Sequence, residues 1–263
     1  MLTTIDWTRP WLAPVADAAG TLDLEHFGMI EALNRRAAAL QLRNERGMAL
    51  SFVPQSQLPD GIAYEAFIGL SARVPTRANL HDFFNALVWL TFPLIKRQLN
   101  ALQAARIACD GVGKSRGAAR DGATLFDENS ALLVVRDAPA GLALLGALRN
   151  HDWHGAFVAR RASFGEHAEV CLFGHALMDK LVTPYKAITA HAWVVLADDE
   201  FFTLAPQARR AWIDLRVARE LAERSLSPLD FTPLPVLGVP GWWPGQDAAF
   251  YADASVFRPR RNQ

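Results

Sequence analysis

The residues of this chain best suited to chemistry begin in one helical pattern. His81 and Asn85 stand four positions apart, and at about 100° per residue they share a helix face with Lys96 and Asn100. Almost all of their neighbours are apolar, so the helix should be buried. A buried polar group left without a partner costs about 1–3 kcal/mol. The pattern therefore predicts either a polar network or a cavity beside His81 and Asn85.

Asn79 and Asp82 have a simpler explanation at the start of the same helix. Asn is a favoured N-cap residue, and an acidic residue three positions later resembles a capping box. Helix capping is thus an alternative to a role in a site for both residues. It does not explain His81 or Asn85.

Two later segments add candidate residues. Arg120 and Asp121 follow a connector rich in Gly, Lys and Arg, and they could fold over a pocket or form an internal ion pair. His175 follows Phe173-Gly174 in a pattern of strand, tight turn and helix, where it could serve a ligand or cap local backbone. The catalytic candidates are therefore His81, Asn85, Asp121 and His175. The candidate cations for an anionic substrate group are Arg77, Lys96, Arg120 and Lys180.

Metal-binding patterns are weak. Asp127 and Glu128 could join Asp121 near His81 around a divalent cation, but a turn between two strands explains this acidic pair more simply. No residue is assigned as a metal ligand, and a divalent cation stays open as a cofactor.

Two further histidine motifs have part of the pattern of a metal site. His151 and His154 have helical spacing but lack a third ligand at a recognisable distance. The dipeptide His81-Asp82 also occurs in HD phosphohydrolases, which are all-helical and need further spaced ligands. Neither motif predicts a metal site.

The elements that would position these residues follow from periodicity and turn residues. The longest predicted helix runs from about Leu80 to Ala108, and Pro93 should kink it because the ring removes a backbone hydrogen bond. Residues 1–20 are expected to be extended, and residues 227–263 to form an irregular, proline-rich C-terminal wrap. The other predicted elements are helices at 24–43, 64–70, 140–150, 174–181 and 206–224, strands near 170–173 and 191–196, and a hairpin of 123–126 with 131–135.

The composition is that of a globular protein. Of the 263 residues, 51% are hydrophobic and 21% charged, which suits a chain that buries a large core. With the elements above, this predicts an α/β or α+β fold: a single mixed domain over residues 1–263, built on a long buried central helix and a small sheet. Lys+Arg and Asp+Glu are equal in number, which argues against a nucleic-acid partner.

Cysteine usage and hydropathy bear on the location. Cys109 and Cys171 have no partner at CxxC spacing, and two lone cysteines suit a reducing compartment. The N-terminus lacks the pattern of a signal peptide, and the most apolar stretch, 83–95, is too short to span a bilayer. We expect a cytoplasmic protein with no membrane partner, and the oligomeric state stays open.

Several long motifs resemble a known family. They include Tyr64-Glu65, the stretch from Val74 to Lys96, Arg120-Asp121 with Thr124 to Glu128, Phe173 to Leu177, Pro235 to Trp242, and Phe250-Tyr251 with Val256 to Pro259. These motifs resemble the bacterial family catalogued as domain of unknown function 3025. The resemblance covers nearly the whole chain, which supports one domain, and it implies no activity.

Two functions compete at this point. One is an enzyme whose pocket gathers His81, Asn85, Arg120, Asp121 and His175 around a small anionic substrate, with a metal-assisted hydrolase as one version. The other is a binding or scaffold protein in which the same polar residues form a buried network with no cavity.

A third function, a protein-interaction module, would use the C-terminal aromatic residues. It requires that Trp242, Trp243, Phe250 and Tyr251 be largely exposed, whereas we expect them to be buried.

Overall fold

The computed structural model describes residues 2–110 and 118–260. The side chain of Arg120, one of the candidate cations, lies outside the described part. The remaining seven candidate residues are all described.

The N-terminal segment is helical rather than extended. After short 3₁₀ turns at Leu2–Thr4 and Pro10–Leu12, helix α1 spans Ala13–Gly20 with Pro14 in its first turn. The prediction of an extended start was wrong because proline is well tolerated at that position of a helix. Helix α2, Met29–Ala39, is shorter than predicted and starts after Gly28.

A parallel pair of short strands follows. Strand β1, Ser51–Pro54, pairs with β2, Arg73–Thr76, and helix α3, Tyr64–Ser71, lies between them in the chain. A 3₁₀ turn at Gln55–Gln57 leaves β1. These strands were not predicted, because their prolines and short length are typical of loops.

The predicted long helix is two helices. Helix α4, Leu80–Thr91, ends at Phe92, whose φ of −127° and ψ of 59° are not helical, and α5, Pro93–Asp110, begins at the proline. Every residue from Asp82 to Leu90 is buried, as the apolar pattern predicts. Pro93 thus breaks the helix instead of kinking it.

The predicted hairpin at 123–135 is wrong. Residues Ala118–Asn129 form helix α6, which leads directly into strand β3, Ser130–Arg136. Ala123, Phe126 and Asp127 are buried at i, i+3 and i+4, the spacing of one helix face. Asp127 and Glu128 therefore belong to the last turn of a helix and not to a hairpin turn.

The larger sheet of the described residues has the strand order β4-β3-β5-β6. Strand β3 pairs antiparallel with β4, Ala168–Leu172, and parallel with β5, Thr189–Ala197. Strand β6, Thr232–Pro235, pairs antiparallel with β5 at the edge, where prolines are accepted. The C-terminal wrap is thus less irregular than predicted.

The remaining helices agree closely with the predicted ranges. Helices α7, α9 and α11 span Pro139–Arg149, His175–Lys180 and Pro206–Glu223. The shorter helical elements are a π-helical turn at Gly155–Ala159, α8 at Ser163–Glu166, α10 at Asp199–Thr203, 3₁₀ turns at Pro228–Asp230 and Val236–Gly238, and α12 at Ala248–Tyr251.

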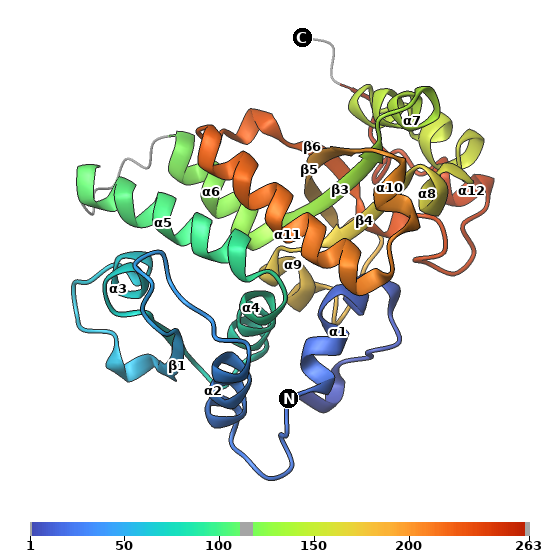
Figure 1. Ribbon diagram of the computed structural model, residues 1–263. Coiled ribbons are helices and arrows are strands. Elements are labelled where there is room, and N and C mark those ends of the chain that lie inside the picture. The colour runs from blue at the N-terminus through green and yellow to red at the C-terminus, as the bar shows by residue number, and fades with distance from the viewer. Residues whose placement is uncertain (1, 111–117, 261–263) are drawn as a thin grey trace.

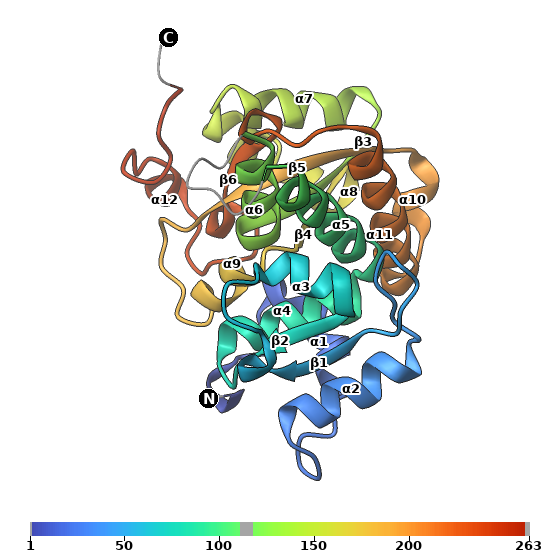
Figure 2. The same cartoon turned by 90° about the vertical axis from the view of Figure 1, so that its left-hand side faces the viewer.

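Helix α4 occupies the centre of this arrangement. Figures 1 and 2 both place it between the larger sheet with its helices and a smaller part made of α2, α3 and the β1–β2 pair. Buried apolar side chains form one cluster that extends from Ile5 to Phe257. The chain is therefore a mixed α/β single domain, as predicted.

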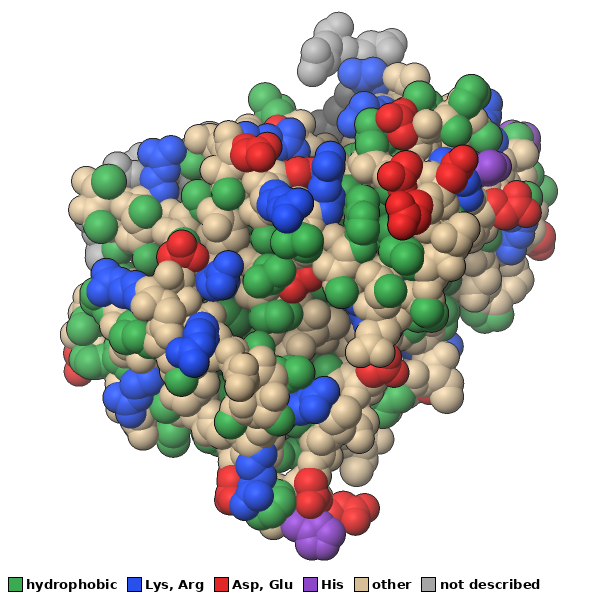
Figure 3. Space-filling model, in the orientation of Figure 1, with side chains coloured by type: hydrophobic (Ala, Val, Ile, Leu, Met, Phe, Trp, Pro, Cys, Tyr) green, Lys and Arg blue, Asp and Glu red, His purple; other side chains and the backbone are tan. Residues whose placement is uncertain are grey.

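The surface and the helix lengths carry two further findings. On the face shown in Figure 3, basic and acidic side chains are interspersed rather than gathered by sign. Among the described residues, no helix combines the length and the hydropathy that crossing a bilayer requires.

Candidate functional site

A polar cavity of about 340 Å³ lies against the start of α4. Its walls come from the 3₁₀ turn after β1, from α3, from the loop before α4, and from the facing ends of α6 and α9. The residues that line it are Gln55, Leu58, Tyr64, Glu65, Arg77, His81, Asp82, Asn85, Asp127, Glu128 and His175. His81 and Asn85 therefore lie beside a cavity, in contrast to the predicted alternative of a buried network without one.

The loop before α4 is fixed by its own side chains. The Asn79 side chain accepts a hydrogen bond from the Asp82 backbone N–H at 2.8 Å, which confirms the predicted N-cap. The Asp82 carboxylate does not complete a capping box. It accepts hydrogen bonds from the Arg77 backbone N–H at 2.6 Å and from the Arg77 guanidinium at 3.0 Å. This arrangement holds Arg77 at the rim of the cavity.

His81 and His175 meet inside the cavity. Their Nε2 atoms lie 3.2 Å apart, and the ring planes are inclined at 76°. His175 is buried, whereas His81 is half-buried. The two histidines come from α4 and α9, so tertiary packing brings them together.

Gly174 explains how His175 reaches this position. A Cβ built on Gly174 would lie 2.5 Å from the Ser130 backbone nitrogen and 2.6 Å from the Glu128 carbonyl oxygen. Only glycine permits so close an approach of two backbones. The start of α9 therefore packs directly against the end of α6, which carries Glu128.

His81, Glu128 and His175 form a group that could hold a metal ion. One ligand atom from each residue lies within 4.8 Å of the other two. Two imidazole nitrogens bound tetrahedrally at about 2.0–2.1 Å would be roughly 3.3 Å apart, and this is close to the spacing of the two histidines. The donor set of two imidazoles and one carboxylate therefore fits a divalent transition metal.

The second ring nitrogen of His175 faces Asp127. The His175 Nδ1 atom is buried without a hydrogen bond and lies 3.8 Å from the Asp127 Oδ2 atom. Burial lowers the pKa of His175 to about 4, although the carboxylate of Asp127 opposes that effect. The imidazole is therefore neutral at pH 7, which is the form that binds a metal.

Asp127 is anchored by a buried cation. The Lys96 Nζ atom donates to Asp127 Oδ1 at 2.6 Å and to Asn85 Oδ1 at 2.9 Å. Burial alone would raise the pKa of Asp127, but Lys96 and then His175 bring it below the ordinary value. Lys96, which was predicted to bind a substrate, is buried and is not among the residues that line the cavity.

Tyr64 and Glu65 extend the polar network, and no chemistry was predicted for them. The Asn85 amide donates to the Tyr64 hydroxyl at 3.0 Å, and the Asn100 amide donates to Glu65 Oε2 at 2.7 Å. Burial, then Asp127, raises the pKa of Glu65, and the same two causes raise the pKa of Glu128. In the sequence they stand out only as a pair of the family motifs at the start of a short helix.

The other predicted site residues are not gathered here. Asp121 is exposed in the first turn of α6, and Lys180 is exposed with its Nζ donating to Asn129 Oδ1 at 3.2 Å. Of the five residues of the predicted pocket, the cavity brings together His81, Asn85 and His175. It adds Arg77, which was predicted to bind the substrate.

Neither the His151 pair nor the C-terminal aromatic residues offer a second site. His154 is exposed, and the His151 ring lies 5.0 Å from the ring of Trp153. Phe250 and Tyr251 are buried, as expected. Trp242 and Trp243 are half-buried and pack against the core.

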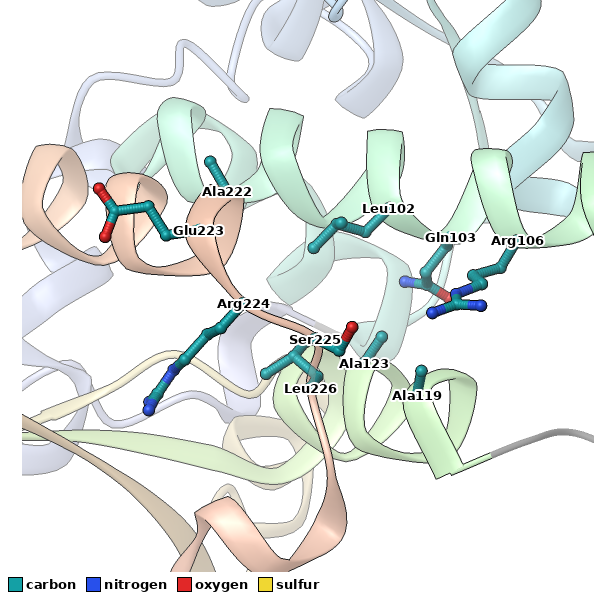
Figure 4. A pocket seen from close by; sticks show the side chains of 10 residues that line it. All are labelled: Leu102, Gln103, Arg106, Ala119, Ala123, Ala222, Glu223, Arg224, Ser225 and Leu226. Carbon is teal, nitrogen blue, oxygen red and sulfur yellow. The ribbon is translucent and has the colours of Figure 1, made fainter.

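Another cavity, of about 230 Å³, lies between the ends of α5 and α11 and the start of α6 (Figure 4). Arg106 and Gln103 approach it from α5, and Ala119 and Ala123 from α6. The Arg224 guanidinium lies over the Trp193 ring, with its carbon 4.1 Å from the ring centre. This cavity lacks the cluster of histidine and carboxylate groups that distinguishes the cavity at α4.

Comparison with known proteins identifies a family. The family model described as a protein of unknown function, DUF3025, matches residues 50–261, which include every residue of the cavity at α4. No curated protein and no solved structure matches the chain.

Proposed function

Because this chain belongs to the DUF3025 family, whose function is unknown, we propose a function from its own residues: a metal-dependent hydrolase of a small anionic substrate. The observation that carries the proposal is the 3.2 Å spacing of the His81 and His175 Nε2 atoms beside Glu128. A divalent cation bound to such a donor set supplies a Lewis acid and activates water near neutral pH.

Among the three candidate ligands, His175 has the surroundings that suit a metal-binding histidine best. His175 is held neutral by burial, and the packing of Gly174 against the end of α6 fixes where the backbone of His175 lies. A carboxylate behind a ligand histidine is a common outer partner that orients the ring. Asp127, itself held by Lys96, lies in that position, with its Oδ2 atom 3.8 Å from His175 Nδ1.

Glu65 favours hydrolysis over other chemistry of the same donor set. Two histidines and a carboxylate also bind iron in oxygenases. Glu65 lines the cavity, its pKa is raised by burial, and within the described residues no Lys or Arg forms an ion pair with it. A carboxyl group of this kind can accept a proton from water and donate it to a leaving group.

The acidic lining of the cavity means that an anionic substrate would need a bound divalent cation. Glu65, Asp82, Asp127 and Glu128 line it, and Arg77 is the cation among its lining residues. This balance disfavours an anion unless a divalent cation adds positive charge. The proposed substrate is therefore an anion that binds the loaded protein, with Arg77 at the rim contacting its charged group.

The proposed setting is the cytoplasm. Cys109 and Cys171 are both free, which supports a reducing compartment. The proposed partner is a small molecule, since the cavity volume is that of a small-ligand site.

The test begins with metal binding. Protein stripped by a chelator is titrated with Zn²⁺, Co²⁺ and Mn²⁺ by calorimetry, and one of these cations should bind at one ion per chain. His81→Ala should weaken binding by more than the 10- to 100-fold typical for loss of an outer partner. His154→Ala, which changes an exposed histidine outside the cavity, should leave binding unchanged.

Activity is then measured with the loaded protein. A panel of p-nitrophenyl phosphate, carboxylate ester and amide substrates should reveal turnover that needs the cation and is lost in His81→Ala. Absence of both metal binding and turnover would overturn the proposal. That outcome would favour a second candidate, a scaffold protein, which is supported by the burial of Lys96, Asp127 and Asn85 in one network.

A further inference from the structure

We infer that Tyr64 is a further catalytic residue, whose hydroxyl proton is directed into the cavity by the hydrogen-bond chain Lys96–Asn85–Tyr64. The inference rests on the proposed hydrolase function and assigns the group that binds the substrate oxygen on which negative charge develops. Asn85 and Lys96 are then positioning residues, since they act through Tyr64.

The direction of the chain is fixed at Lys96. An ammonium group has three donors and no acceptor, so the contact of 2.9 Å from Lys96 Nζ to Asn85 must end on the amide oxygen. With its oxygen toward Lys96, the Asn85 amide turns its NH₂ group toward Tyr64. This NH₂ group donates to the phenol oxygen at 3.0 Å, because it has no acceptor for the Tyr64 proton. Each step follows from the chemistry of the donor before it.

The Tyr64 hydroxyl is thereby left with its own proton to donate. Within residues 2–110 and 118–260, the hydrogen bond from Asn85 is the contact of this hydroxyl, and no acceptor for its proton lies in range. Tyr64 lines the same cavity as His81, Glu128 and His175. The Tyr64 side chain is half-buried and lines the cavity, so a ligand oxygen bound there is a suitable acceptor for this proton.

The surroundings keep the phenol protonated. Burial, followed by the charge of Glu65, raises the pKa of Tyr64 well above the ordinary value. The bond donated by Asn85, which the ammonium of Lys96 polarises, strengthens the phenol as a donor through cooperativity. Tyr64 thus serves as a hydrogen-bond donor and not as a proton source.

The chemical role follows from hydrolysis. As the oxygen of water bonds to the carbonyl or phosphoryl centre, the electron pair of the substrate double bond moves onto its oxygen. The Tyr64 O–H, retaining its proton, donates to that oxygen and stabilises the charge, as donors of an oxyanion hole do. The water proton is accepted by a separate group, for which Glu65 is placed.

The test uses inorganic phosphate as a probe of oxyanion binding, so that it does not depend on finding the substrate. Cobalt-loaded protein is titrated with phosphate and followed by the visible absorption of the cobalt ion. Tyr64→Phe should bind cobalt as the wild-type protein does but bind phosphate about 10- to 100-fold more weakly, as expected for one hydrogen bond to a charged group. Tyr185→Phe, at an exposed tyrosine, is the matched control and should bind phosphate normally.

A double-mutant cycle tests the chain itself. In Asn85→Asp the new carboxylate still accepts a hydrogen bond from Lys96, but it would also accept one from the Tyr64 hydroxyl. The hydroxyl would then point toward residue 85 and no longer into the cavity. Phosphate binding should weaken, and adding Tyr64→Phe should cause no further loss. If the added charge repelled phosphate directly, the two losses would add, and the chain would be refuted.

The outcomes separate this inference from the proposed function. If the wild-type protein binds none of Co²⁺, Zn²⁺ and Mn²⁺, the hydrolase and the role of Tyr64 are overturned together; if it binds Zn²⁺ or Mn²⁺ but not Co²⁺, the phosphate titration is followed by calorimetry with that ion. Normal cobalt binding with either no phosphate binding, or equal phosphate affinity in the wild-type protein and Tyr64→Phe, overturns the role of Tyr64 and leaves the metal site standing.

Discussion

The Nε2 atoms of His81 and His175 lie 3.2 Å apart although the residues are 94 positions apart in the chain. Two imidazoles facing each other through the same nitrogen can share one proton or one metal ion. The nearby Glu128 carboxylate makes the second arrangement the more complete one. The stability of the protein should therefore depend on divalent cations.

A bound cation should raise the melting temperature. At a free concentration of 100 times Kd, binding to the folded state alone adds about 2.7 kcal/mol, which corresponds to roughly 5–10 °C for a chain of this size. Glu128→Gln should abolish most of this shift, whereas Glu166→Gln, at an exposed position, should retain it. A thermal-shift assay with Zn²⁺, Co²⁺ and Mn²⁺ provides the measurement, and equal shifts in all three proteins would place the cation elsewhere.

Asp127→Asn should reduce both stability and metal affinity. It leaves the buried Lys96 ammonium without its carboxylate, and breaking a buried ion pair costs about 3–5 kcal/mol. It also removes the group behind His175, so metal affinity should fall about 10- to 100-fold. Urea denaturation and calorimetry measure the two effects.

Two further variants show whether the loss of stability in Asp127→Asn comes from the unpaired charge of Lys96 or from altered packing. Lys96→Met combined with Asp127→Leu should be more stable than Asp127→Asn alone, because no buried charge is left unpaired. Lys186→Met, at a more exposed pair, should cost less stability than Asp127→Asn. An Asp127→Asn variant as stable as Lys186→Met would show that the Lys96–Asp127 pair contributes little.

Gly174→Ala should disturb the site through the backbone. The added methyl group would meet the backbone of Ser130 and Glu128 at 2.5–2.6 Å, so α9 must move away from the end of α6. Stability should fall by several kcal/mol, and metal affinity should fall because His175 and Glu128 separate. Gly146→Ala is the matched control, since nothing lies within 4 Å of its added Cβ and alanine favours the helix. Equal stability of the two variants would contradict this account.

Local periodicity predicted the parts of the fold that depend on neighbours in sequence. Helices α7 and α11 and strand β5 were found within a few residues of the structure. The predicted stripe of Asn85 and Lys96 also holds, although a break at Phe92 separates them, because α5 resumes in a direction that keeps their contact. These features are set by spacing along the chain.

The failures concern residues whose surroundings come from distant segments. The stretch from Ala123 to Ser130 has the composition of a hairpin. In the fold, the centre of the Phe126 ring lies 5.2 Å from that of Phe173 and 5.4 Å from that of Trp193, and a helix places Phe126 on the face that meets these two rings. Because of that error, a turn was preferred as the explanation of Glu128 over a place beside His81. No spacing rule relates α4, α6 and α9, so the donor set could be recognised only after folding.

The residues that line the cavity were therefore predicted in part. His81, Asn85 and His175 stood out because polar residues in apolar surroundings need partners. Asp121 was predicted because it follows a connector and precedes the presumed hairpin, whereas the acidic residue of α6 that is grouped with both histidines is Glu128, two helical turns later. Tyr64 stood out in the sequence only within the family motif, because the role inferred for it depends on the direction of hydrogen bonds that the sequence does not show.

Asp214 gives the chain a predictable dependence on pH. It lies on α11 and accepts hydrogen bonds from the backbone N–H groups of Leu94 at 3.0 Å and Ile95 at 2.9 Å, which caps the start of α5. Burial raises the pKa of Asp214 to about 7, although these bonds and Arg97 oppose the effect. The unfolded chain would have the ordinary value of about 3.9.

Stability from this group should fall as pH rises from about 4 to 7. In that window the folded protein still holds the proton while the unfolded chain has released it, so the slope is negative, up to about 1.4 kcal/mol per pH unit. Above the folded pKa both states are ionised and the slope vanishes. Asp214→Asn cannot titrate, so the stability advantage of the wild-type protein over this variant should shrink from pH 5 to 7 and then stay constant.

Urea unfolding at pH 5, 6, 7 and 8 measures the difference between the two proteins, in which the titration of all other groups cancels. Asp253→Asn is the control, because the hydrogen bond from Lys186 lowers the pKa of Asp253 to about 2, outside this window. Its profile should run parallel to that of the wild-type protein. Parallel profiles for Asp214→Asn as well would mean that Asp214 is ionised throughout, and that the two backbone N–H groups of α5 outweigh its burial.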